Sequence, residues 1–215
     1  MVEISGPEFC LDKSAENLVI LLHGWGASGN NFIEIGKAMS KFLPNSFFVA
    51  PNAPFEREVG GYQWFSLEDR SEVAILTGIK KAADILNDFI DMKLKSFGFS
   101  EKQLSLVGFS QGAMLALHTS LRRSNPCSSV VAYSGRLVAP SKLPRELKSK
   151  PNICIIHSRD DVVVPFTAFE AAVEALTSNN IEIESHRLDG IGHTIDNKGI
   201  KLGAEFIKQY FSNQT

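Results

Sequence analysis

The pentapeptide Gly108-Phe109-Ser110-Gln111-Gly112 is the segment of this chain whose residue types and spacing most directly suggest chemistry. It follows an apolar run at 104–107 and precedes helix-forming residues at 113–117. A serine held at a sharp strand-to-helix turn exposes its hydroxyl to a general base, and the helix N-terminus faces the negative charge that develops during acyl transfer. The motif therefore predicts a nucleophilic serine, Ser110, although a glycine-rich turn before an ordinary helix is the alternative interpretation.

A serine nucleophile needs a histidine as base and an acid that orients the histidine. Where the serine lies between a strand and a helix, these residues follow in the order Ser, Asp or Glu, His. Of the five histidines, only His186 and His193 follow both Ser110 and the acidic pair Asp160-Asp161. Either aspartate could orient the imidazole.

His193 is favoured over His186 because of its sequence context. It lies in the segment 189–194, whose glycines allow the backbone to bring an imidazole over the end of a sheet. His186 lies in the alternating segment 181–186, where it would be a strand side chain facing solvent or a neighbouring element. For His157, at the end of another apolar run, we expect a structural role.

The tetrahedral intermediate of acyl transfer also needs hydrogen-bond donors for its oxyanion. One is expected to be the backbone N–H of Gln111, at the start of the helix after the serine. The other is expected to be the Trp25 N–H, because Gly24 and Gly26 let the loop after the early apolar run 18–22 turn inward. A simple strand-to-helix turn is the alternative interpretation of this loop.

Acyl recognition should be apolar, because a lipid tail gains about 25 cal/mol per Å² on leaving water. Trp64, Phe65, Leu67 and Leu137 are the candidates for this role. Three of them lie in a long irregular stretch, 51–70, and long aromatic loops are usually functional. Ordinary packing of the loop on the sheet is the alternative. The length and glycines of the loop also suggest that it opens and closes.

The elements that must position these residues alternate regularly. Apolar runs at 18–22, 47–50, 104–107, 130–133 and 153–156 predict parallel strands that are covered on both faces, and 181–188 predicts a strand nearer an edge. Amphipathic helix patterns lie between them. The sequence therefore predicts an α/β fold, with a mostly parallel central sheet, helices on both faces and one domain over 1–215.

Composition excludes several classes of function. A net charge of −2 and a pI near 6.2 give no basic surface for nucleic acid. We find no secretion signal and no apolar run long enough to span a membrane, so a cytoplasmic protein is expected. The aromatic loop leaves transient contact with a membrane surface open. Three cysteines without metal-ligand spacing argue against a disulfide framework or a zinc site, and Cys154 is expected to be core packing.

Six motifs, spread over nearly the whole chain, together resemble the carboxylesterase and acyl-protein thioesterase (phospholipase/carboxylesterase) family of α/β-hydrolases. They are Leu-His-Gly-x-Gly at 22–26, Pro-x-Ala-Pro at 51–54, Trp-Phe at 64–65, Gly-Phe-Ser-Gln-Gly at 108–112, His-x-x-x-Asp-x-Val-Val-Pro at 157–165 and Gly-x-Gly-His-x-Ile at 190–195. The resemblance implies an α/β-hydrolase fold without a large separate cap domain. It selects Asp161 as the acid and agrees with Ser110 and His193.

The resemblance further implies a serine carboxylesterase acting on short- to medium-chain acyl esters, without a metal or organic cofactor. Acyl thioesters, acylated proteins and lysophospholipids are further candidate substrates. Departures from the family pattern at Trp25, Ala27, Ser66 and Ser158 remove no catalytic group, but a tryptophan beside the oxyanion site argues against long acyl chains. A scaffold protein without catalysis, and a peptidase or lactone hydrolase, are the alternatives. Monomer and homodimer are both open.

Overall fold

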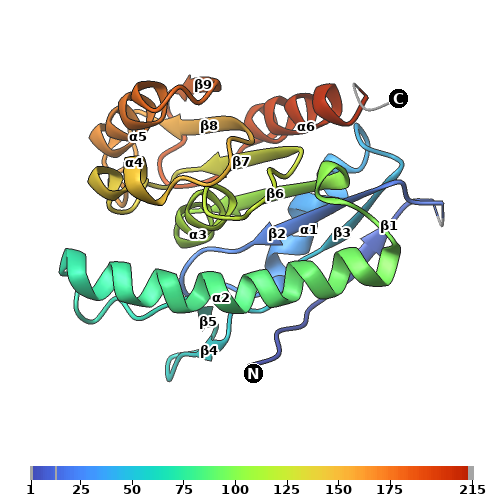
Figure 1. The fold of residues 1–215 in the computed structure, drawn as a ribbon, viewed down its shortest axis with the longest axis horizontal. Coiled ribbons are helices and arrows are strands. Elements are labelled where there is room, and N and C mark those ends of the chain that lie inside the picture. The colour runs from blue at the N-terminus through green and yellow to red at the C-terminus, as the bar shows by residue number, and fades with distance from the viewer. Residues whose placement is uncertain (1, 13, 213–215) are drawn as a thin grey trace.

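The computed structural model describes residues 2–12 and 14–212, which form a central sheet between two layers of helices (Figure 1). The strands of the sheet are β1 (Glu8–Cys10), β2 (Asn17–Leu22), β3 (Ser46–Val49), β6 (Leu104–Phe109), β7 (Ser129–Tyr133), β8 (Asn152–Ser158) and β9 (Ile183–Leu188). Their spatial order is β1-β3-β2-β6-β7-β8-β9. β1 runs antiparallel to β3, and every other neighbouring pair is parallel. The predicted mostly parallel sheet is confirmed.

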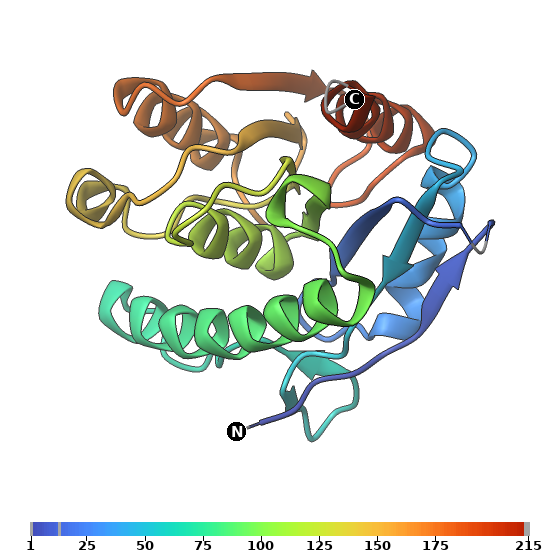
Figure 2. The same cartoon turned by 45° about the vertical axis from the view of Figure 1, so that its right-hand side comes forward.

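The helices divide between the two faces of the sheet. They are α1 (Gly29–Met39), α2 (Glu72–Phe97), α3 (Gln111–Ser120), α4 (Leu143–Glu146), α5 (Phe166–Ser178) and α6 (Asn197–Ser212), with short 3-10 turns at Glu101–Gln103 and Pro140–Lys142. Helices α2 to α5 lie on one face and α1 and α6 on the other (Figure 2).

Strand alternation explains the two layers. Along β2, Leu18 and Ile20 belong to the apolar cluster beneath α2, α3 and α5, whereas Val19 and Leu21 belong to the cluster beneath α1 and α6. Successive strand side chains point to opposite faces, so a run that is apolar at every position buries both faces. β9 alternates instead and forms an edge of the sheet, as its sequence pattern predicted.

The segment 51–70 differs from its expected irregular form. It contains a short hairpin of β4 (Phe55–Glu56) and β5 (Tyr62–Gln63), whose turn includes the left-handed Gly60 and Gly61. After the hairpin the chain turns inward and enters the core. No helix among the described residues has the length and hydropathy needed to cross a bilayer.

Candidate active site

The turn between β6 and α3 holds Ser110 in a strained backbone conformation, with φ 54° and ψ −115°. A non-glycine residue at positive φ costs of order 1–3 kcal/mol, and such strain concentrates at functional sites. The turn is possible only because Gly108 and Gly112 lack side chains. A Cβ on Gly112 would lie 1.9 Å from the Leu22 carbonyl oxygen, and one on Gly108 would lie 2.4 Å from the Gly112 carbonyl oxygen. The Ser110 N–H donates to Tyr133 O at 2.9 Å, which fixes the turn against β7.

A chain of hydrogen bonds runs from Ser110 to Asp161. Ser110 Oγ lies 3.0 Å from His193 Nε2, and His193 Nδ1 lies 2.7 Å from Asp161 Oδ2. Since an ionised carboxylate only accepts, Nδ1 carries the proton and donates it, which leaves Nε2 free to accept the Ser110 O–H. The Phe109 ring packs against the imidazole with a centroid distance of 4.8 Å. The geometry thus presents the imidazole tautomer that a general base requires.

The loop after β8 holds the Asp161 carboxylate. Its Oδ1 accepts the N–H groups of Val163 at 2.9 Å and Val164 at 2.8 Å. Burial of the carboxyl group opposes its ionisation, but the hydrogen bonds from His193, Val164 and Val163 outweigh that effect and hold the pKa of Asp161 below its usual value. The neighbouring Asp160 instead accepts the Gly190 N–H. Asp161 is therefore the aspartate that contacts His193.

His157 lies directly beneath this loop and is buried. Its Nε2 is 2.8 Å from Val164 O, and a carbonyl can only accept, so Nε2 carries the proton. Burial lowers the pKa of His157 and keeps the ring neutral. His157 thus packs under the Asp161 loop and does not contact Ser110, in agreement with a structural role.

The loop after β2 brings the backbone of Trp25 to the same cavity, opposite Gln111 at the start of α3. In the described part of the chain, neither backbone N–H has a hydrogen-bond partner. The β4–β5 hairpin holds this loop, because Gly26 N donates to Tyr62 O and Tyr62 N donates to Ala27 O, both at 2.8 Å. Two unpartnered donors on residues that line one cavity are candidates for an oxyanion site.

The Trp25 side chain is 45% exposed, but two contacts restrict its movement. Its Nε1–H donates to Gln63 Oε1 at 2.9 Å, and the guanidinium of Arg57 lies 3.5 Å from the centre of its ring. Both partners come from the hairpin region. The indole therefore forms a fixed part of the cavity wall.

Gln111 contributes its side chain as well as its backbone, which the sequence did not predict. Its Oε1 accepts the Trp64 N–H at 2.9 Å, and its Nε2 donates to Phe65 O at 2.8 Å. Trp64 Nε1 donates in turn to His23 O at 2.9 Å. The two loops that carry the candidate oxyanion donors are thus joined through Trp64.

Trp64 and Phe65 were expected to contact substrate, and the structure corrects this expectation. Their exposed fractions are 0% and 1%, and neither lines the cavity. They belong to the core cluster beneath α2 because the chain after the hairpin turns inward at Trp64. Their contacts with Gln111 and His23 give them a positioning role instead.

A cavity of about 960 Å³ opens beside Ser110. Leu67 and Leu137, the other two candidates for acyl contacts, line it, and Met114 and Ile75 extend the same apolar wall. A volume of this size is typical of small-molecule sites. Ser110, His193 and Trp25 share its wall, so a bound ester would lie against the serine.

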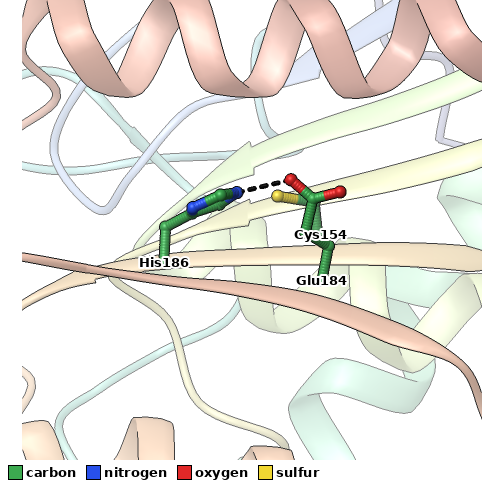
Figure 3. Close-up of side chains that lie close together, drawn as sticks. All are labelled: Cys154, Glu184 and His186. Carbon is green, nitrogen blue, oxygen red and sulfur yellow. Dashed lines mark hydrogen bonds and ion pairs between the residues drawn. The ribbon is translucent and has the colours of Figure 1, made fainter.

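A group that could hold a metal ion, Cys154, Glu184 and His186, lies on β8 and β9 (Figure 3). His186 Nε2 already contacts Glu184 Oε1 at 2.6 Å. The Cys154 thiol is fully buried, and desolvation raises its pKa far above the usual range, which opposes the thiolate that a metal would require. We assign no metal here. His186 does not line the cavity that contains Ser110 and His193.

The sheet order, the strand–Ser110–helix turn and the adjacent histidine define an α/β-hydrolase. The chain belongs to the phospholipase/carboxylesterase family, whose model matches residues 9–211. It is 27% identical to esterase YpfH of Escherichia coli over 198 residues, covering 92% of this chain and 84% of the relative. It is also 27% identical to carboxylesterase SOBER1 of Arabidopsis thaliana over 214 residues, covering 91% of each chain.

Solved structures agree with this assignment. Esterase PE8 superposes with a TM-score of 0.92 at 38% identity, over 97% of this chain and 100% of that chain. Arabidopsis SOBER1 superposes with a TM-score of 0.76 at 26% identity, over 90% of this chain and 98% of that chain. The protein is therefore a carboxylic ester hydrolase by family.

Proposed function

We propose that the protein hydrolyses short- to medium-chain acyl esters through a Ser110–His193–Asp161 triad and a covalent acyl-enzyme. The observation that carries this proposal is the hydrogen-bond chain from Ser110 Oγ through the imidazole to the Asp161 carboxylate, at the wall of a largely apolar cavity. Family membership supports ester substrates. Acyl thioesters and lysophospholipids are further substrates that the same chemistry would admit.

In the acylation half-reaction, Ser110 Oγ attacks the ester carbonyl carbon while its proton passes to His193 Nε2. The carbonyl oxygen becomes an oxyanion, which the Trp25 and Gln111 N–H groups stabilise. Asp161 stabilises the imidazolium formed on His193 and holds its orientation. The imidazolium then returns the proton to the departing alkoxide, so that the alcohol leaves and the acyl group remains on Ser110.

In the deacylation half-reaction, His193 takes a proton from water, and the resulting hydroxide attacks the acyl carbon. The same two N–H groups stabilise the second oxyanion. When this intermediate collapses, the proton on His193 passes to Ser110 Oγ and the carboxylic acid is released. Every proton in the cycle therefore passes through Nε2, the ring nitrogen that faces Ser110 in the structure.

The fixed indole of Trp25 supports a preference for shorter acyl chains. It lines the cavity beside the proposed oxyanion site, and its contacts with Gln63 and Arg57 restrict its movement. A bulky group that cannot move aside reduces the room for a long chain. We therefore place the maximum of kcat/KM at butanoyl to octanoyl esters.

A substrate panel tests the proposal. The panel comprises 4-nitrophenyl acetate, butanoate, octanoate and palmitate, octanoyl-coenzyme A, a lysophosphatidylcholine and a peptide 4-nitroanilide. Hydrolysis of the esters should fall by at least about 10³-fold in Ser110→Ala, because the oxyanion donors alone give only weak residual rates. Ser120→Ala is the matched control, since Ser120 lies on the same helix with its hydroxyl bonded to Leu117 O.

The outcomes separate the candidate functions. Ester turnover that persists in Ser110→Ala would contradict the triad. Faster cleavage of the anilide than of the esters would move the assignment to a peptidase. Folded wild-type protein that turns over nothing in the panel would favour the scaffold alternative.

A further inference from the structure

The charged side chains in the wall of the cavity are all of one sign. Among the described residues that line it, Arg70 and Arg136 carry full charges and no aspartate or glutamate is present. The acid of the proposed triad, Asp161, is only 5% exposed and lies behind His193. A ligand in the cavity therefore meets two guanidinium groups and no competing carboxylate.

These two arginines are not neutralised by the protein. Within residues 2–12 and 14–212, neither forms an ion pair, a hydrogen bond or a ring contact, and both side chains are exposed. Other arginines of the chain are paired: Arg122 contacts Glu146 at 2.7 Å, and Arg123 contacts Asp91 at 2.7 Å. A guanidinium presents its donors in a fixed fork that matches carboxylate and phosphate oxygens. The unpaired guanidinium groups at the substrate cavity are thus available to bind an anion.

Both arginines also adjoin residues on the α2 side of the cavity. Arg70 directly precedes Ser71, the N-cap of α2, and Arg136 is followed by Leu137, which packs in the α2-side cluster with Ile75. The opposite wall contains Phe32, Ile35 and Ile195, which belong to the cluster on the α1 and α6 side. Ser110 directly follows β6, the middle strand of the sheet, and so lies at the carboxyl end of this strand between the two faces. An ester that spans Ser110 would meet the two cations together with Leu67 and Leu137 on the α2 side, and Phe32, Ile35 and Ile195 on the other.

We infer that the site selects esters that carry a second, anionic group, a carboxylate or a phosphate, on the portion bound at the Arg70–Arg136 side. This inference rests on the proposed ester hydrolysis. The methylene groups of that portion contact Leu67 and Leu137, and the other portion of the substrate lies against Phe32, Ile35 and Ile195. Attraction between exposed charges is screened by salt, so the preference for an anionic substrate weakens as ionic strength rises.

Two matched substrate pairs test the inference. The carboxylate arm compares 4-nitrophenyl hydrogen glutarate with 4-nitrophenyl pentanoate. The phosphate arm compares 2-butanoyloxyethyl phosphate with 2-methoxyethyl butanoate. Wild type should show a kcat/KM at least tenfold higher for the anionic member of one pair at 20 mM NaCl, and the favoured pair identifies the anion. The ratio should fall several-fold at 500 mM NaCl.

Arginine variants show which residues produce the preference for anionic substrates. Arg70→Gln/Arg136→Gln should lower the anionic-to-neutral ratio at least tenfold, whereas Arg145→Gln should keep it. Arg145, on α4, is a matched control because it is exposed, lies outside the cavity wall and has no ion-pair partner in the described part of the chain. A wild-type ratio near or below one in both pairs, or a ratio that survives in the double variant, would overturn the inference.

The inference and the proposed function fail in different ways. Neutral esters that are hydrolysed by wild type and not by Ser110→Ala leave the proposed function standing, whatever the ratio is. If neither member of a pair is turned over, calorimetric titration of Ser110→Ala with both glutarate-pair esters decides the charge preference. Tighter binding of the anionic ester, lost in Ser110→Ala/Arg70→Gln/Arg136→Gln, supports it, and equal binding contradicts it.

Discussion

Replacement of Gln111 by leucine tests how the candidate oxyanion loops are held together. The side chain is 1% exposed, and its amide bonds two buried backbone groups, the Trp64 N–H and the Phe65 carbonyl. Leucine fills a similar volume but leaves both groups without a partner. Each buried backbone group without a hydrogen-bond partner costs about 1–3 kcal/mol. The free energy of unfolding should therefore fall by about 2–6 kcal/mol.

Gln103→Leu is the matched control. Gln103 also bonds two backbone groups, accepting from Ser100 N at 3.1 Å and donating to Glu16 O at 3.0 Å, but in an exposed position where water can replace it. Its loss should cost less than about 1 kcal/mol. Urea unfolding followed by tryptophan fluorescence gives both values, and kcat for 4-nitrophenyl butanoate should fall only in Gln111→Leu. Equal destabilisation by the two substitutions would refute the argument from burial.

Further predictions concern the turn, the acid and a buried histidine. Gly112→Ala should prevent stable folding, as judged by circular dichroism, because its Cβ would lie 1.9 Å from the Leu22 carbonyl oxygen. Asp161→Asn should keep the fold but lower kcat by roughly 10³–10⁴, because the imidazole would take the wrong tautomer. His118 has its pKa lowered from 6.5 to about 3, chiefly by burial. The unfolded chain therefore takes up a proton below pH 6.5 that the folded protein does not, and stability should fall by up to about 1.4 kcal/mol per pH unit towards pH 3. Urea unfolding at several pH values should show a weaker dependence in His118→Phe. Amides of 55–63 should exchange with deuterium faster than those of β6 if the hairpin segment opens, and equally slow exchange would contradict opening.

Much of the fold could be predicted because parallel strands buried on both faces leave a strong pattern. Uninterrupted apolar runs such as 104–107 have few alternative structures once helical patterns flank them. β1, with three residues, and the β4–β5 hairpin were missed because strands this short carry no periodicity. The order of the strands in the sheet also depends on contacts between distant segments.

The candidate site, too, could be predicted from the sequence only in part. Ser110 could be proposed from its motif and His193 from its order and loop context, because the chemistry constrains residue type and sequence. Order left Asp160 and Asp161 open, and only the family resemblance selected Asp161. The burial of Trp64 and Phe65 could not, because an aromatic pair in a loop looks the same whether it faces a cavity or the core. The amide contacts of Gln111 and the unpaired state of Arg70 are properties of side-chain placement, which a sequence pattern does not specify.

The proposed mechanism depends on Ser110 being an activated nucleophile. Labelling with a fluorophosphonate, followed by peptide mass spectrometry, tests it most directly because the probe forms a stable adduct only with such a serine. An adduct is expected on the peptide that contains Ser110 in wild type, none in Ser110→Ala, and a steep loss of labelling rate in His193→Ala. An adduct on a different residue, or an unchanged rate in His193→Ala, would contradict it.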